Sequence, residues 1–250
     1  MKHLILLLVL VLGALPVQAA LSACPVDSPG KDIFAYPELM KSHAVFQDYE
    51  IRVFDSLPCD KPIFKYRSGI EVLKAGKRVY SGTGWSFAIG YPLEDDQAPD
   101  TVPVPPGTDI VGEGQPDLLI SEWSGGAHCC YTFHLFQLGD AFRKIQSIPL
   151  FDADESSFVR RSGVKSLVLN TADYSAFAYF PAGFAGSPAG RVLLSFQEGR
   201  FRPDQGLMKA NAPATGETDK CAALFRKSRD WKHGQPMGMW YYAKIGRAHV

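Results

Sequence analysis

The sequence has no excess of charge of either sign, since its 250 residues include 26 Lys and Arg against 26 Asp and Glu. Proteins that bind nucleic acid use surplus Lys and Arg to neutralise phosphates, so the balance argues against that class of partner. Long hydrophobic runs are also scarce, and none beyond the N-terminal segment is long and apolar enough to cross a bilayer. We therefore expect no nucleic-acid partner and no membrane span in the mature chain.

The one prominent apolar run lies at the N-terminus and is typical of an export signal. A short basic start precedes the apolar residues 4–16, and small residues lead to a cleavage position after Ala19. This pattern predicts a signal peptide over residues 1–19 and an exported protein, periplasmic or secreted. The four residues that end at Cys24 also match a bacterial lipobox, which would instead anchor the protein in the envelope through a lipid on Cys24.

Turn-forming residues and alternating strands indicate a mainly β protein. The chain has 23 glycines and 18 prolines, which favour many turns and short strands over a helix bundle. Apolar and polar residues alternate over residues 49–53, and residues 70–73 and 78–80 flank a turn as the strands of a hairpin do. Gly76 would supply the positive φ that this turn needs.

The chain after the signal peptide divides into four predicted regions and a six-residue artefact. Thr218 could cap a helix whose apolar stripe includes Cys221, Leu224 and Trp231, and this stripe is typical of core packing. The last six residues match the translation of a sequencing adapter, so we expect them to be an artefact at the end of a gene fragment. The predicted regions are an N-terminal β region (20–97), a Pro-rich loop between sub-modules (98–107), a repeat-like β region (108–205), a C-terminal helical segment (206–244) and the artefact (245–250).

Two later stretches share one pattern of turns and strands. Residues 113–120 lead through a hairpin to residues 138–143, and residues 162–169 lead likewise to residues 198–202. In each, a Gly turn precedes a buried strand, and a second Gly turn precedes a Phe-Arg pair. Such recurrence predicts stacked four-stranded sheets, because one unit alone cannot bury its apolar face. The alternative is that any two antiparallel hairpins share these features.

The densest cluster of chemically distinctive residues is 123–134, where two strands flank a Gly125-Gly126 turn. Aromatic surface and polar tips coincide here, as they do in carbohydrate and peptide sites. We therefore take Trp123, His128 and Tyr131 as candidate ligand-binding residues. The alternative for Trp123 is the hydrophobic core, and for His128 it is a structural role in the turn.

The five cysteines of the mature chain predict disulfides, because an exported protein meets an oxidising environment. We favour a bridge from Cys24 to Cys59 and a second from the Cys129/Cys130 pair to Cys221, although the sequence does not determine the connectivity.

Two reactive uses of the same cluster compete with the disulfides. His128, Cys129, Cys130 and His134 could ligate a metal, but consecutive strand residues point to opposite faces. Ser124 or Cys129 could be a nucleophile activated by His128 or His134, with Asp117 or Glu122 orienting the imidazole. No Gly-x-Ser-x-Gly motif surrounds Ser124.

An acidic loop keeps part of a calcium-binding pattern. Asp109, Glu113 and Asp117 hold the first, fifth and ninth positions of such a loop, but Val111 replaces one ligand. Calcium is the one cofactor that these residues suggest, and a solvated turn is the alternative.

The motif Ser-Gly-Gly-Ala-His-Cys-Cys at residues 124–130 resembles a mark of a group of exported bacterial proteins. Residues 109–202 are also similar to the FG-GAP or VCBS repeats of integrin-type β-propellers, with Val111, Arg160 and Ser166 departing from the ligand pattern. The resemblance implies a β scaffold and no catalytic mechanism.

The strand pattern and this resemblance together predict an antiparallel β-propeller-like or stacked-sheet domain with a C-terminal α-helix. It would act as a non-catalytic binding or structural module of the cell envelope, with a carbohydrate, a peptide or an envelope protein as partner. The alternative is a hydrolase that uses His128 with Ser124 or Cys129.

Overall fold

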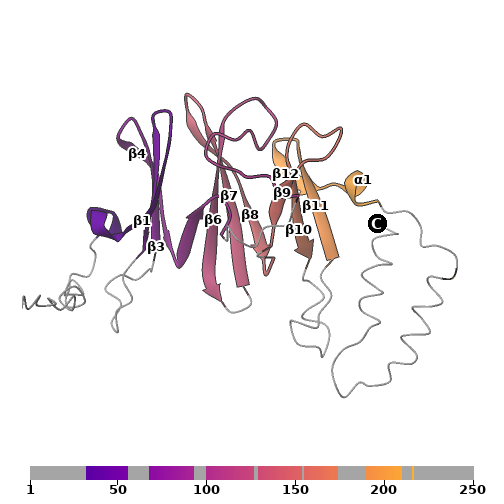
Figure 1. Cartoon of the computed structure of the whole chain (residues 1–250), viewed down its shortest axis with the longest axis horizontal. Coiled ribbons are helices and arrows are strands. Elements are labelled where there is room, and N and C mark those ends of the chain that lie inside the picture. The colour runs from indigo at the N-terminus through magenta and orange to yellow at the C-terminus, as the bar shows by residue number, and fades with distance from the viewer. Residues whose placement is uncertain are drawn as a thin grey trace, which may run out of the picture.

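The computed structural model describes residues 32–55, 68–92, 100–126, 129–153, 155–173, 190–209 and 216, without the side chain of Cys129. Of these residues, 61% lie in strands and 7% in helices, which confirms the mainly β prediction. The strands form three antiparallel sheets of four strands each, arranged side by side (Figure 1).

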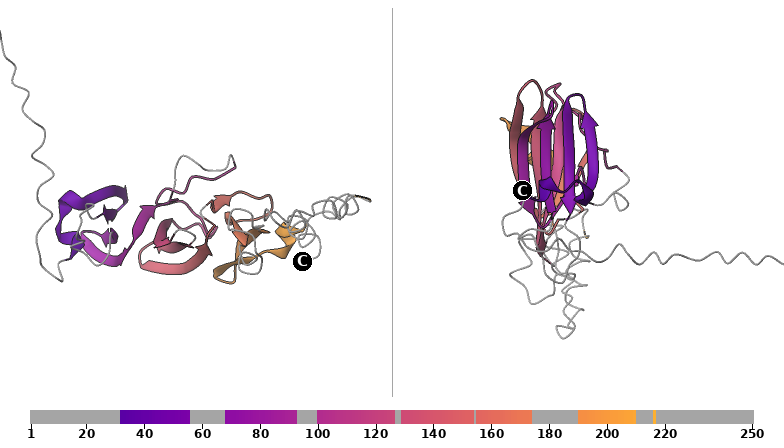
Figure 2. Two further views of the ribbon diagram at one scale, coloured as in Figure 1. Left: turned by 90° about the horizontal axis from the view of Figure 1, so that it is seen from below. Right: turned by 90° about the vertical axis from the view of Figure 1, so that its left-hand side faces the viewer.

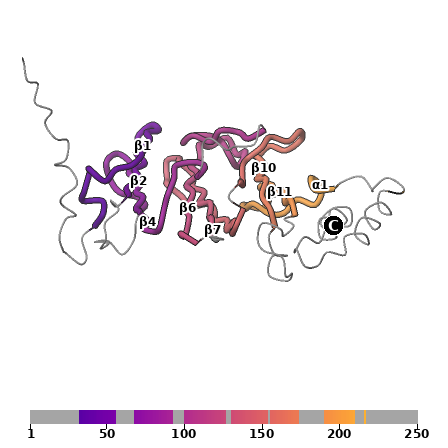
Figure 3. The backbone as a smooth tube through the Cα atoms, turned by 60° about the horizontal axis from the view of Figure 1, so that its bottom comes forward, coloured from indigo at the N-terminus to yellow at the C-terminus, as the bar shows by residue number. Residues whose placement is uncertain are grey.

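Each sheet is built from consecutive strands of the chain, and Figure 3 follows the chain from one sheet to the next. The first sheet contains β1 (Met40–Phe46), β2 (Tyr49–Asp55), β3 (Ser68–Lys74) and β4 (Lys77–Gly84). The middle sheet contains β5 (Ser86–Ile89), β6 (Asp117–Gly126), β7 (Cys129–Leu138) and β8 (Phe142–Phe151). The third sheet contains β9 (Ser157–Val159), β10 (Val168–Asp173), β11 (Gly190–Gln197) and β12 (Arg200–Pro203).

The predicted hairpin and the predicted repeat both have structural counterparts. Ala75 and Gly76 have φ values of 48° and 75° in the turn between β3 and β4, so the residues between these strands adopt the expected left-handed backbone. The two sequence stretches that share a pattern supply the second to fourth strands of the middle and third sheets. Their second Gly turns, at Gly139 and Gly199, both join a third strand to a fourth.

The middle sheet is buried on both faces, which explains the unbroken apolar run at the start of β6. Leu118 and Ile120 pack with the first sheet, whereas Leu119 packs with the third. Figure 2 shows the three sheets in a row, with the middle one between its neighbours. Fully burying one such side chain stabilises the fold by about 2 kcal/mol. The β7 and β8 residues in these two cores are Phe136 and Leu138 toward the first sheet, and Phe133, Leu135, Ile148 and Leu150 toward the third.

The Pro-rich loop connects β5 to β6 within the middle sheet rather than joining two sub-modules. It also reaches the third sheet, because Thr101 forms a β-bridge with Val159. The Tyr91 hydroxyl donates to the Val102 carbonyl at 2.8 Å and accepts from the Phe158 N–H at 2.9 Å. Burial raises the pKa of Tyr91 to about 12.

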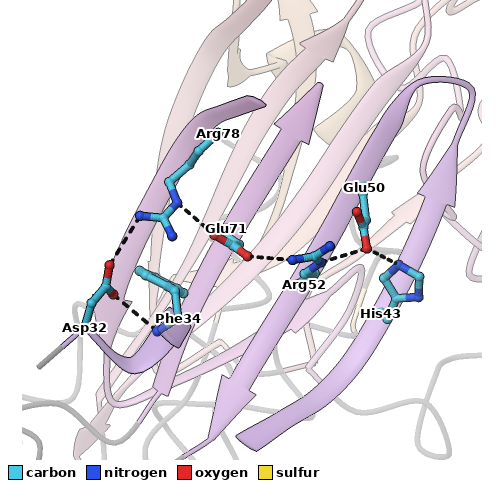
Figure 4. A network of polar contacts seen from close by, with 7 residues as sticks. All are labelled: Asp32, Phe34, His43, Glu50, Arg52, Glu71 and Arg78. Carbon is cyan, nitrogen blue, oxygen red and sulfur yellow. Dashed lines mark hydrogen bonds and ion pairs between the residues drawn. The ribbon is translucent and has the colours of Figure 1, made fainter. Parts of the chain in front are cut away.

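The outer face of the first sheet carries a chain of alternating charges (Figure 4). Glu71, only 2% exposed, accepts from Arg52 at 3.3 Å and from Arg78 at 2.8 Å. The hydrogen bond from Arg52 lowers the pKa of Glu50, which also contacts His43. The 3₁₀-helices η1 (Ile33–Ala35) and η2 (Pro37–Leu39) contribute Ile33 and Leu39 to a small apolar cluster around Phe54 of β2.

The outer face of the third sheet is apolar instead. Val159, Val168 and Leu193 form a buried cluster there, and the short helix α1 (Gln205–Met208) contributes Leu207 and Met208. Asp204 caps α1 by accepting from the Leu207 N–H. The described strands close into no ring, so the structure supports stacked antiparallel sheets as the coarse architecture.

Several predictions fall on residues outside the described part of the chain. These are the signal peptide, the lipobox, Cys24, Cys59, Cys221, the helix after Thr218 and the last six residues. Among the described helices, none has the length and hydropathy to cross a membrane.

Candidate functional site

Four aromatic side chains form a row across one end of the middle sheet. Trp123 of β6 pairs with Tyr131 of β7, which pairs with Phe151 of β8. The Trp123 and Tyr131 rings are stacked, with centroids 6.3 Å apart and planes 22° apart. Trp85 precedes Ser86, the β5 partner of Trp123. Two of the predicted ligand residues, Trp123 and Tyr131, therefore lie together, and we call the four residues the aromatic row.

The aromatic row leaves much apolar surface accessible. Trp85 is 39% exposed and Phe151 is 60% exposed, whereas Trp123 and Tyr131 are half-buried. Phe151 also has a φ of 53°, in the left-handed region that large side chains avoid. Strained backbone beside exposed aromatic surface is typical of a binding site rather than of a packing solution. Sequence reasoning missed Trp85 and Phe151, because only strand register brings them to this end.

The Gly-rich turn contacts the aromatic row at Gly125. Gly125 has a φ of 88°, and a Cβ at this position would overlap the Trp85 ring, so a glycine is required for the ring to pack there. The Ser124 hydroxyl accepts the Cys130 N–H at 2.8 Å across the turn. Ser124 thus holds the two strands together in this structure, and no described histidine contacts it.

Of the five cysteines of the mature chain, Cys130 is the one whose side chain is described. The disulfides and their pairing therefore stay a prediction. His128 also lies outside the described residues.

His134 lies between two side chains from the neighbouring strands. Its Nε2 is 2.7 Å from Glu122 Oε2, and its Nδ1 is 2.8 Å from Ser147 Oγ. The sequence suggested His134 and Glu122 as members of one site, which the structure brings together, but the expected serine was Ser124. Ser147 was missed because its position opposite His134 depends on the register of β7 and β8.

The acidic loop directs two of its carboxylates at its own backbone. Asp109 accepts the N–H groups of Gly112, Glu113 and Gly114 at 2.8 to 3.1 Å. Asp117 accepts those of Ile110 and Val111. Within the described part of the chain, no three His, Cys, Asp or Glu side chains are grouped to hold a metal ion. The calcium site stays a prediction.

Asp117 is fully buried, and no positively charged side chain contacts it within the described residues. Desolvation raises its pKa to about 6, against the lowering effect of the Val111 and Ile110 N–H groups. The negative charges of Asp109 and Glu113 raise it further. Its Oδ1 has no hydrogen-bond partner.

A groove of about 720 Å³ lies between β1, β5 and the Pro-rich loop. Its two charged side chains, Lys41 and His43, are already paired with Asp55 and Glu50 at 2.9 Å each. Backbone, proline and small side chains supply most of the remaining wall, so the groove offers little charge for recognising a ligand.

No protein-family model, curated protein or solved structure matches the chain. The resemblance carried by residues 124–130 therefore stays a prediction, and the site has to be judged on its own geometry.

Proposed function

We propose that the protein is a binding module that docks a carbohydrate of the cell envelope on the aromatic row, without chemistry at Ser124. The observation that carries this proposal is the exposure of Phe151, which pairs with Tyr131, and of Trp85, whose ring packs against Gly125, at the end of the sheet that holds the stacked Trp123 and Tyr131 rings. An envelope location follows from the predicted signal peptide and is part of the proposal.

A sugar ring matches this surface chemically. Its C–H face is apolar and flat, so it gains by covering an aromatic ring, while its hydroxyl groups stay at the edge. The indole N–H of Trp123 is a polar tip of the kind that can bond those hydroxyls. Aromatic residues on three adjacent strands, with Trp85 just before a fourth, suit an extended ligand such as a polysaccharide.

The scaffold that we propose is propeller-like. Each sheet is an antiparallel series of four consecutive strands, and the sheets pack face to face as the blades of a propeller do. The rigid middle sheet, covered on both faces, would fix the spacing of the rings before a ligand arrives.

Ser124 supports the binding function over hydrolysis at this hairpin. Its hydroxyl accepts the Cys130 N–H, an interaction that shapes the turn. A hydrolase based on Ser124 would need a base within hydrogen-bond reach, which the described residues do not supply.

Cosedimentation with peptidoglycan and other insoluble envelope polysaccharides tests the proposal. We expect saturable binding to at least one of them, weakened tenfold or more by Trp85→Ala and by Phe151→Ala. Val45→Ala is the matched control, because Val45 is 64% exposed but lies on the first sheet.

Three results would overturn the proposal. They are no binding to any polysaccharide, equal binding by the control and the aromatic variants, and aromatic-dependent binding to peptides in place of polysaccharides.

A further inference from the structure

Ser147, His134 and Glu122 form a hydrogen-bonded line across three adjacent strands of the middle sheet. The separations of 2.8 Å and 2.7 Å are those of a nucleophile, a base and an orienting carboxylate. Consecutive strand residues point to opposite faces, so Glu122 lies on the face opposite Trp123. This line is therefore separate from the aromatic row and does not rest on the function proposed for it.

In such a site the nucleophile has to be accessible to the substrate, whereas its base has to be held in place, and the exposure of Ser147 and His134 follows this pattern. Ser147 is exposed on β8, the last strand of the middle sheet, where a substrate can reach it. His134 is only 8% exposed, so its ring is held in place, and Glu122 lies behind it. Neither ring nitrogen of His134 is left for another role.

The Glu122 carboxylate lies close to Gly84 of the first sheet. A Cβ at Gly84, the last residue of β4, would lie 2.9 Å from Glu122 Oε1. The negative charge of Glu122 adds to the effect of burial in raising the pKa of Tyr80 on the same sheet. Glu122 is thus held close against the first sheet, in position to hydrogen-bond the His134 ring.

We propose that Ser147 is a nucleophile for small carboxylic esters, with His134 as its base and Glu122 as the residue that positions His134. Ser147 Oγ forms a bond to the ester carbonyl carbon while its proton passes to His134 Nδ1. The alcohol then leaves with that proton as the C–O bond breaks, and water hydrolyses the acyl-serine by the same route in reverse, releasing the acid.

The strand position of Ser147 supplies donors for the oxyanion. β8 has a hydrogen-bonded neighbour on one side only, β7, within the described sheets. Every second N–H of such an edge strand points away from the sheet and can bond the oxygen of a tetrahedral intermediate. Ser147 is exposed on this last strand of the sheet, so an ester can reach its hydroxyl from solvent, and small esters are the simplest substrates with which to test it.

A fluorophosphonate probe with intact-mass detection tests the nucleophile directly. Attack by Ser147 Oγ on phosphorus expels fluoride and leaves one phosphonyl group on the protein. We expect one adduct, mapped to Ser147, that is lost in Ser147→Ala and His134→Gln. Ser81→Ala, at an exposed serine of β4, is the matched control and should label as the parent does. Labelling at another serine, or none in the folded parent protein, would overturn the proposal.

Hydrolysis of p-nitrophenyl acetate separates positioning from folding. We expect Ser147→Ala to fall to the rate of buffer, and Glu122→Gln to lose about 10²-fold or more. Loss of the carboxylate should lower kcat far more than it changes KM, because Glu122 orients His134 and does not contact the ester.

Equal activity of the parent and Ser147→Ala, or a Glu122→Gln variant that changes KM and leaves kcat unchanged, would contradict these roles. Urea unfolding of each variant distinguishes a lost fold from a lost site. Failure here would leave the carbohydrate proposal unaffected, because that proposal depends on Trp85 and Phe151.

Discussion

The two ends of β6 are opposite exceptions to the usual burial of apolar residues and exposure of polar ones. At its first residue, Asp117 is a fully buried carboxyl group, and the surrounding loop supplies backbone N–H groups to it. At its far end, Trp123 belongs to a row in which Trp85 and Phe151 keep large apolar surfaces exposed. Buried polar groups and exposed apolar patches are the informative exceptions to the rule of polar outside and apolar inside.

This contrast indicates that the loop at the Asp117 end stabilises the fold and that the aromatic row at the other end binds a ligand. The loop before Asp117 joins the middle and third sheets, since the Leu167 N–H donates to the Ile110 carbonyl. The Asp109 and Asp117 carboxylates accept hydrogen bonds from the N–H groups of this same loop. Phe151 has a positive φ where the register of β7 and β8 shifts beside Tyr131, and its ring is largely exposed, so its side chain contributes little to the core.

The largest expected effect is at the loop end, for Gly112→Ala. Gly112 has a φ of 76°, and a Cβ there would lie 2.6 Å from the backbone N of Ser166, in the loop that leads into β10 of the third sheet. Backbone strain and overlap together should lower the free energy of unfolding by about 4 kcal/mol. Gly114→Ala is the matched control, because Gly114 has a φ of 75° but nothing within 4 Å of the added carbon.

The control should cost about 1 kcal/mol, from strain alone. Equal losses in urea unfolding of the two variants would show that the loop does not press against the third sheet.

The next effect is a pH dependence at Asp117. Its folded pKa is raised to about 6, so the folded state holds a proton that the unfolded state has already released above pH 4. The contribution of this group to stability is therefore greatest below pH 4 and is lost as the pH rises through 6, by about 3 kcal/mol.

Asp117→Asn keeps one oxygen to accept from Ile110 and Val111 but does not titrate. Urea unfolding between pH 4 and 7 should show a smaller decline for this variant than for the parent. Parallel pH profiles for the two proteins would show that Asp117 is not desolvated.

The smallest stability effect is expected at the aromatic end, for Phe151→Gly. Glycine adopts a φ of 53° without strain, and the lost ring is mostly exposed, so the free energy of unfolding should rise or fall by no more than about 1 kcal/mol. Thermal unfolding measures this, and a loss of more than about 2 kcal/mol would mean that Phe151 serves the core and not a ligand.

The sequence allowed the strand content and part of the strand order to be predicted, because alternation and turn residues are local signals. The turn at Ala75 and Gly76 and the repeat that supplies β6 and β10 were found in this way. The role of the Pro-rich loop was misjudged, because pairing of β5 with β6 across 27 intervening residues leaves no local pattern.

The candidate site was predictable only where its members are neighbours in sequence. Trp123 and Tyr131 flank one turn, and the motif around that turn drew attention to them. Trp85, Ser147 and Phe151 reach their sites through strand register, which depends on the packing of whole sheets. The acidic spacing of Asp109 and Asp117 is real, but the sequence does not show that both carboxylates accept backbone N–H groups.

The central claim is that the aromatic row binds the ligand and the loop before Asp117 serves the fold. The most direct test is a two-dimensional NMR titration of the ¹⁵N-labelled protein with soluble fragments of the polysaccharide that it binds. We expect the indole N–H resonances of Trp85 and Trp123 to shift in a saturable way, while the backbone amides of residues 109–114 stay unchanged. Saturable shifts in residues 109–114 with unchanged indole resonances would contradict the account, because the ligand would then bind the end that we assign to the fold.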